Sequence, residues 1–125
     1  VDSVLRKIPD TFWNIADVLV VDNHSQDKTE DRVLAFNFQN PPDRQANIVR
    51  PVRNMGYAGS QKFAYQLALQ FSVAQWVIML HGDGQYAPEL LDRFTPFFSK
   101  ANTQSIAVYP AVPIAIACFS LNFSG

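Results

Sequence analysis

Short apolar runs alternate with amphipathic segments along this chain. Three runs predict strands, at residues 17–22, 46–52 and 75–80, and the last of them contains five consecutive apolar residues, as in a strand buried on both faces. In the segments around them apolar residues recur at helical spacing, which predicts helices over residues 1–8, 28–38, 60–71 and 88–98. This alternation predicts an α/β fold with a mostly parallel sheet and helices on both of its faces.

Local signals predict where these helices begin and end. Pro9 ends the first helix, and Asp27 opens a capping-box pattern at the start of the second. Ser60 can cap the third helix, which places residues 53–59 in a loop. The fourth helix begins at Pro88, and its spacing turns four side chains inward: Leu90, Leu91, Phe94 and Phe97.

The last segment, residues 103–125, does not continue the alternation. It is apolar and interrupted by Pro110 and Pro113, and a strand over residues 106–109 is the one element expected there. We therefore expect a folded domain over residues 1–102 and an apolar tail over residues 103–125.

Composition narrows the class of protein. The chain has 125 residues, of which 48% are hydrophobic and 17% charged, so it can bury a core as one domain. Its formal net charge is -1 and no basic block stands out, which argues against nucleic-acid binding. Cys118 is the single cysteine, which excludes an internal disulfide and fits a reducing, cytoplasmic compartment.

A polar loop follows each of the three predicted strands, at residues 22–27, 53–57 and 81–85. Because parallel strands end at the same edge of a sheet, we expect these loops to converge there. Asp22 ends a buried strand, where its carboxylate can bind a base or a ribose; the alternative is a turn formed with Ser25, Asp27 and Thr29. Gly56 and Gly59 let backbone approach a phosphate, with charge from Arg53 or Lys62; the alternative is a tight turn with solvated basic residues.

The third loop contains candidate metal ligands. His81, Asp83 and Gln85 alternate, so they point to one side if the chain stays extended there. One imidazole, one carboxylate and one amide can hold a divalent cation beside substrate phosphates. The alternative for His81 is a strand end at which the imidazole bonds to backbone. His24 lacks such neighbours and is expected at the surface.

These three loops resemble those of family 2 glycosyltransferases with the GT-A fold. VVDNHSQDKT is similar to the family's base loop VVDD-x-S-x-D-x-T, and RNMGYAGSQKFAYQLAL to its N-x-G loop and following helix. MLHGDGQYAPELL resembles the metal loop D-A-D-G-Q-x-x-P-E of the polyprenol-phosphate sugar synthases. The resemblance covers about residues 3–100 and departs at two positions, where His81 and Asn23 each stand in place of an Asp.

The resemblance implies a Rossmann-like, nucleotide-sugar-binding half of a GT-A domain. The implied activity is transfer of a sugar from a nucleotide-diphosphate sugar with inversion. The implied nucleotide-binding residues are Asp22, Asn23, Asn54, Gly56 and Lys62. The implied ligands of a divalent cation, Mn²⁺ or Mg²⁺, are Asp83, His81 and Gln85.

Other parts of the family pattern have no counterpart in this sequence. The family's first strand with its P-x-x-N-E loop would precede Val1, and nothing in residues 101–125 resembles the G-S-R segment or the later acidic base, so no catalytic base is identified. The implied acceptor is a polyprenol phosphate, lipid or glycan, reached in the cytoplasm by peripheral association with the inner face of the membrane. One alternative is a truncated, non-catalytic copy that retains nucleotide binding. Another is an unrelated Rossmann-like nucleotide binder, which the absence of G-x-G-x-x-G disfavours.

Overall fold

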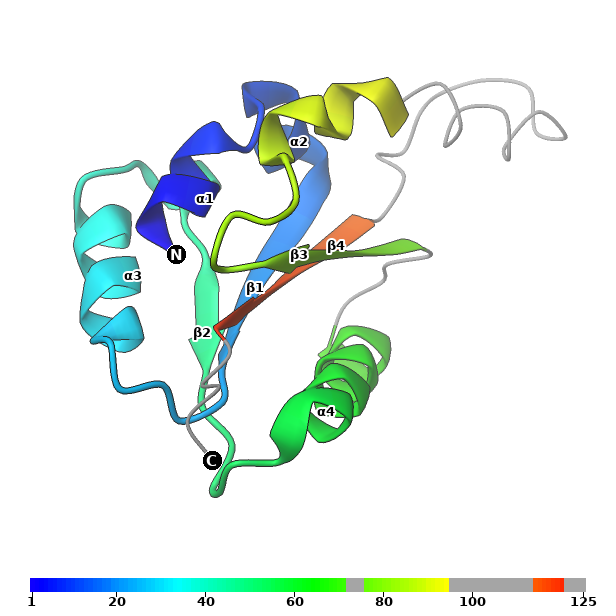
Figure 1. Ribbon diagram of the computed structural model, residues 1–125. Coiled ribbons are helices and arrows are strands. Elements are labelled where there is room, and N and C mark those ends of the chain that lie inside the picture. Colours follow the sequence, from blue (N-terminus) through cyan, green and yellow to red (C-terminus); the bar gives the residue numbers. More distant parts are fainter. Residues whose placement is uncertain (72–75, 95–113, 121–125) are drawn as a thin grey trace, which may run out of the picture.

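The sheet at the centre of the protein has four parallel strands. The computed structural model describes residues 1–71, 76–94 and 114–120 (Figure 1). The strands are β1 (Ala16–Asp22), β2 (Asn47–Val49), β3 (Trp76–His81) and β4 (Ile114–Ser120), in the order β2-β1-β4-β3. All three pairings between neighbours are parallel. The structure is therefore an α/β fold with a small parallel sheet, and the three predicted strands are present with shifted ends.

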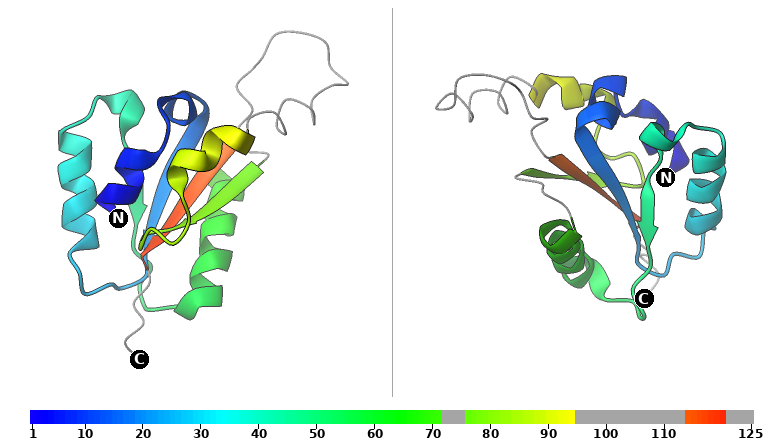
Figure 2. Two further views of the ribbon diagram at one scale, coloured as in Figure 1. Left: turned by 45° about the horizontal axis from the view of Figure 1, so that its top comes forward. Right: turned by 180° about the vertical axis from the view of Figure 1, so that it is seen from behind.

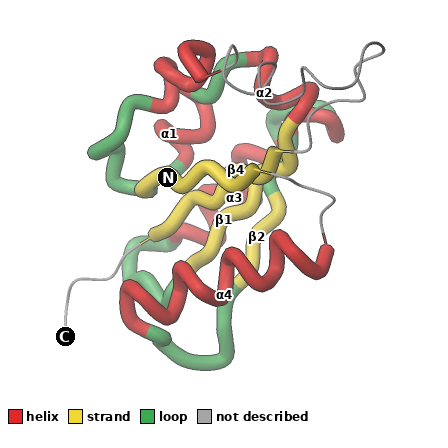
Figure 3. Tube along the Cα trace, turned by 90° about the vertical axis from the view of Figure 1, so that its right-hand side faces the viewer, coloured by secondary structure: helices red, strands yellow, loops and turns green. Residues whose placement is uncertain are grey.

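Helices cover both faces of this sheet. The α-helices are α1 (Asp2–Lys7), α2 (Asp10–Ile15), α3 (Thr29–Phe38) and α4 (Gly56–Phe71), and two 3-10 helices are η1 (Pro42–Arg44) and η2 (Pro88–Phe94). Figure 2 shows α3 and α4 on opposite sides of the strands. Figure 3 shows α1 and α2 above the strands and α4 below them.

Alternate residues of β1 pack into two separate hydrophobic cores, as expected for a strand covered on both faces. Val18 and Val20 belong to a large cluster with side chains from α1, α2, α3 and η2, including Leu5, Phe12, Phe36 and Leu91. Leu19 and Val21 face the other side, where Ala64 of α4 is fully buried. The larger core therefore lies on the face that carries α1, α2 and α3.

Strand β4 lies between β1 and β3, where the sequence predicted no strand. Ile114 pairs with Ala16 of β1 and Trp76 of β3. The strand that was predicted in this tail, residues 106–109, lies outside the described residues. Residues 114–119, IAIACF, are an apolar run like those of the other strands, but Pro110 and Pro113 directly before them led to the interpretation of this segment as an irregular tail.

Two helix starts differ from prediction. Helix α2 was not predicted, because Pro9 was interpreted only as a stop; Pro9 instead stands at the N-cap of α2. Helix α4 begins at Gly56, not beyond Ser60, so most of the predicted loop at residues 53–59 is helical. Ser60 Oγ donates to the carbonyl of Tyr57, 2.9 Å away, within the first turns of that helix.

The ends of two other helices also required correction. The capping box at Asp27 does not form, because Lys28 stands at the N-cap of α3 in a left-handed conformation without a side-chain cap. The fourth predicted helix starts at Pro88 as expected but is a 3-10 helix as far as it is described. Its side chains therefore follow a different period: Leu91 is buried, whereas Leu90 and Phe94 are exposed. Phe97 lies outside the described residues.

Candidate functional site at the carboxyl edge of the sheet

The loops after β1, β2 and β3 meet at one edge of the sheet, because the three strands run parallel. The chain leaves this edge through α3 toward one face and through α4 toward the other (Figure 1). Open α/β sheets place their ligands at such an edge. None of the described helices has the length and apolar character needed to cross a membrane.

Asn23 joins the loop after β1 to the start of α4. The residue is 3% exposed. Asn23 Oδ1 accepts the backbone N–H of Met55 at 2.8 Å. Asn23 Nδ2 donates to Asn54 Oδ1 at 3.0 Å and to the Gly56 carbonyl at 3.3 Å. The structure therefore brings together three of the predicted nucleotide-binding residues, Asn23, Asn54 and Gly56.

Gly56 begins α4 with a φ of +69°, a conformation that glycine adopts without the steric cost of a Cβ. Its N–H donates to Asn54 Oδ1 at 2.9 Å. Two amides at the start of α4, those of Met55 and Gly56, are thus already bound by asparagine side chains. Lys62, also a predicted contact, is exposed farther along α4. Arg53 is exposed in the preceding loop.

Asp22 lies at the end of β1 with 2% of its surface exposed. Ser25 donates its backbone N–H to Asp22 Oδ1 at 2.9 Å, and the Ser25 hydroxyl also approaches this oxygen. Asp22 therefore forms a turn with Ser25, as its alternative interpretation predicted. Because both donors meet Oδ1, ligand binding by Asp22 would use Oδ2.

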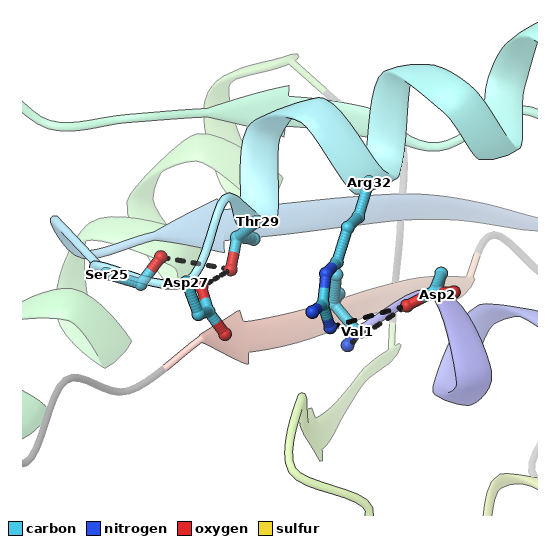
Figure 4. Close-up of polar contacts among 6 residues, drawn as sticks. All are labelled: Val1, Asp2, Ser25, Asp27, Thr29 and Arg32. Carbon is cyan, nitrogen blue, oxygen red and sulfur yellow. Dashed lines mark hydrogen bonds and ion pairs between the residues drawn. The ribbon is translucent and has the colours of Figure 1, made fainter.

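Ser25, Asp27 and Thr29 form a local turn that leads into α3, as their alternative interpretation predicted (Figure 4). The Thr29 hydroxyl donates to Asp27, and Ser25 Oγ lies 3.0 Å from Thr29 Oγ1. Ser25 has one hydroxyl proton, so it donates to Asp22 or to Thr29 but not to both at once. The hydrogen bond from Thr29 holds the pKa of Asp27 below its ordinary value, with a smaller contribution from Ser25 and partial opposition from desolvation.

His81 at the end of β3 lies between two tyrosines. His81 as a whole residue is 7% exposed. Its ring centroid lies 5.8 Å from that of Tyr57 and 4.9 Å from that of Tyr86, the latter in an edge-on arrangement. His81 Nε2 is 3.5 Å from Tyr57 Oη, while Nδ1 has no hydrogen-bond partner among the described residues. The Tyr57–His81 contact joins the start of α4 to the end of β3.

The other two predicted metal ligands lie in an exposed turn. The Gly84 N–H donates to the His81 carbonyl at 3.3 Å, so the chain turns here and does not stay extended. Asp83 Oδ1 accepts the Gln85 N–H at 3.0 Å. The assumption that placed His81, Asp83 and Gln85 on one side is therefore wrong.

The predicted metal ligands fit a divalent cation only in part. Asp83 is an exposed carboxylate, the hard oxygen ligand that Mg²⁺ and Mn²⁺ accept. His81 is enclosed by two tyrosines, so it does not fit as readily. Within residues 1–71, 76–94 and 114–120, no three His, Cys, Asp or Glu side chains gather as a metal centre would require. The cation site stays a prediction.

His24 lies half-buried between the first two loops, where the sequence predicted a surface residue. Its Nε2 is 2.6 Å from the carbonyl of Pro51, and Arg50 lies 3.4 Å from Nδ1. Because a carbonyl only accepts, Nε2 carries the proton and Nδ1 is the acceptor that faces Arg50. Sequence reasoning missed the His24–Pro51 and Tyr57–His81 contacts because these partners are 27 and 24 positions apart. It also missed the contact of Tyr86 with His81, which depends on the turn between them.

The comparison with protein families decides which group the chain belongs to. A family model described as glycosyl transferase family 2 matches residues 1–115. The chain belongs to this family. No curated protein and no solved structure matches it. Family membership supports a glycosyltransferase-type function; the polyprenol-phosphate branch stays a prediction.

Proposed function

We propose that this family 2 chain binds a nucleotide-diphosphate sugar at the carboxyl edge of its sheet and takes part in inverting transfer of the sugar. One observation carries the proposal. The Asn23 hydrogen bonds and the Tyr57–His81 contact tie the loops after β1, β2 and β3 into one polar region. Membership of glycosyl transferase family 2 supplies the class of reaction.

The nucleoside would lie against the loop after β1. Asp22 Oδ2 can accept a hydrogen bond from a base N–H or a ribose hydroxyl, while Ser25 holds Oδ1. Asn54 can donate from Nδ2, because Oδ1 already receives Asn23 and Gly56. The diphosphate would lie toward the N-terminus of α4, whose partial positive charge favours anions, with Lys62 as a candidate counter-charge.

A divalent cation would be held by Asp83 together with the diphosphate oxygens, and Gln85 or His81 would contribute secondarily. When bound, the cation neutralises charge that develops on the diphosphate leaving group. The Gln85 N–H donates to Asp83 Oδ1 at 3.0 Å, so Oδ2 would be the oxygen that binds the cation. Its exposure allows the cation to arrive with the nucleotide.

The remaining partners follow from the same resemblance. We propose a polyprenol phosphate, another lipid or a glycan as acceptor, and a cytoplasmic location with peripheral association at the inner face of the membrane. The family match supports an acceptor without identifying its chemistry.

Calorimetric titration with UDP and GDP, each with and without Mn²⁺, tests the proposal. We expect one nucleotide to bind, and we expect Asp22→Ala to weaken its binding by about 1–3 kcal/mol, because an acceptor is lost from a largely desolvated site. Asp43→Ala is the matched control, since Asp43 is an exposed carboxylate in η1 before β2, at the opposite edge. Equal losses of nucleotide affinity in Asp22→Ala and Asp43→Ala, or no nucleotide binding by the wild-type protein, would contradict the proposal. A sugar-transfer assay then separates the enzyme from a chain that only binds.

A further inference from the structure

We propose that Asn23 is a positioning residue that fixes Asn54 and the start of α4 for the nucleotide, and that Asn23 makes no nucleotide contact of its own. The proposal rests on the proposed function for the identity of the ligand. Its structural basis is a set of hydrogen bonds that we call the amide clamp: the side chains of Asn23 and Asn54 with the backbone of Met55 and Gly56.

The chemistry of the partners fixes the orientation of the Asn23 amide. A backbone N–H only donates, so the atom that faces Met55 N at 2.8 Å is Oδ1. A carbonyl only accepts, so the atom that faces Gly56 O at 3.3 Å is Nδ2. Both ends of the carboxamide are therefore hydrogen-bonded, and the residue is 3% exposed. This leaves Asn23 little capacity for a ligand.

The orientation of Asn54 follows from that of Asn23. Asn23 Nδ2 and the Gly56 N–H are both donors, so the Asn54 atom that they share, at 3.0 and 2.9 Å, is Oδ1. Asn54 therefore turns its Nδ2 away from the amide clamp at an exposed position of the loop. Asn23 acts through Asn54, because it determines which end of that amide a ligand meets.

An aspartate could not replace Asn23 in this arrangement. A carboxylate still accepts the Met55 N–H, but it cannot donate to Asn54 Oδ1 or to the Gly56 carbonyl. It would instead place negative charge against two acceptors. In the variant Asn54→Asp, a carboxylate oxygen could still accept from Asn23 Nδ2 and from the Gly56 N–H, because Asn54 contributes only its oxygen to the amide clamp.

The test compares Asn23→Asp with two variants that add the same charge. Asn54→Asp keeps every acceptor of the amide clamp, and Asn14→Asp changes an exposed residue of α2 at the amino end of β1. Without nucleotide, we expect amide exchange at Met55 and Gly56 to accelerate by about tenfold or more in Asn23→Asp alone. We expect nucleotide affinity to fall by a similar factor in Asn23→Asp and to stay unchanged in Asn14→Asp.

A pH series separates positioning from a general loss of stability. A protonated carboxyl group has one O–H donor and one acceptor, so it can donate again to Asn54 Oδ1. Between roughly pH 6 and pH 4, protection of Gly56 in Asn23→Asp should recover relative to the wild-type protein at the same pH. Asn14→Asp should show no such recovery. A loss of Gly56 protection in Asn23→Asp that does not depend on pH would contradict the amide clamp.

The remaining outcomes are also decisive. If the wild-type protein binds nucleotide and Asn23→Asp binds it equally well, Asn23 has no positioning role although the proposed function stands. If exchange is unchanged in Asn23→Asp while affinity falls, Asn23 contacts the nucleotide directly and the inference is wrong. If the wild-type protein binds no nucleotide, the proposed function fails, and exchange alone decides whether the amide clamp exists.

A second variant covers the case in which Asn23→Asp does not fold. Asn54→Ala changes an exposed residue and removes the acceptor shared by Asn23 and Gly56. It leaves the bond between Asn23 and Met55 in place. Exchange should then accelerate at Gly56 more than at Met55, and equal protection of both amides in this variant and the wild-type protein would refute the proposed arrangement.

Discussion

Tyr57 in the first turn of α4 lies against His81 at the end of β3, with Oη 3.5 Å from Nε2 and ring centroids 5.8 Å apart. Tyr86, five residues after His81 in the same loop, contacts this imidazole edge-on with ring centroids 4.9 Å apart. His81 therefore packs as an aromatic ring in a largely dehydrated position, and its Nδ1 has no partner among the described residues. These contacts favour a packing role for His81 over metal ligation, and the two roles predict different effects of substitution.

Replacing His81 by Phe keeps a ring between the two tyrosines and removes both nitrogens. Because Nδ1 has no partner among the described residues and Nε2 has only a long contact with Tyr57 Oη at 3.5 Å, we expect His81→Phe to change the free energy of unfolding by less than about 1 kcal/mol, whereas His81→Ala should cost about 2–4 kcal/mol by leaving a cavity. Urea unfolding of both variants measures this difference. Equal destabilisation by Phe and Ala would indicate that a nitrogen of His81 has an essential partner.

Asp83 is the residue on which cation binding should depend. We expect Asp83→Asn to abolish the extra Mn²⁺ affinity that nucleotide confers, because the amide offers the cation no charge. Glu89→Gln is the matched control, since it removes a nearby exposed carboxylate at the start of η2. Calorimetry with Mn²⁺ and Mg²⁺ at fixed nucleotide concentration measures the metal affinity of both variants. An unchanged metal affinity in Asp83→Asn would falsify the metal assignment.

Gly59 allows a close approach within the first turns of α4. A Cβ on Gly59 would lie 2.9 Å from Cβ of Met55, too close for either residue to remain in place. Gly-to-Ala changes inside helices normally stabilise by about 1 kcal/mol, but here we expect a loss of about 1–3 kcal/mol. Thermal unfolding of Gly59→Ala measures it, with Gln66→Ala on the exposed side of α4 as control. A stabilised Gly59→Ala protein would show that Met55 is free to shift.

Asp27 should make stability depend on acid pH. Its pKa is lowered in the folded protein, so its stabilising effect is complete above the ordinary pKa of the group and is lost as the pH falls through the lowered value. The difference in unfolding free energy between wild-type protein and Asp27→Asn should therefore shrink on acidification below about pH 4. Denaturation at several pH values measures it, and a constant difference would contradict the pKa shift.

Two of the strands that the sequence predicted have a signal that is local in sequence. Buried parallel strands require unbroken apolar runs, and residues 17–22 and 75–80 supply them within a single window. Their common direction places the polar loops together, so the edge that carries Asp22 and Asn23 was predictable without coordinates. The alternation of apolar runs and helices was sufficient for that conclusion.

The features that the sequence did not reveal depend on distant partners or on small residues. Asn23 bonds with residues 31 to 33 positions away, and nothing near it in sequence shows that its amide is occupied. The start of α4 was missed because Gly56 and Gly59 were interpreted as loop residues, whereas one provides a left-handed φ and the other a close contact. The turn at Gly84 likewise ended the extended chain on which the three-ligand metal site depended.

The position of β4 gives assembly of the sheet a fixed order. Within the described sheet, β3 pairs with β4 and not with β1, so β3 cannot join the first two strands until the segment Ile114–Ser120 is in place. Pairings between remote segments form slowly, because the intervening chain must be closed first. During synthesis on the ribosome, the first two strands and α3 can associate early. Strand β3 has no strand partner from the sheet until β4 has been synthesised. The hazardous interval for misfolding and aggregation is therefore the synthesis of the residues that separate β3 from β4.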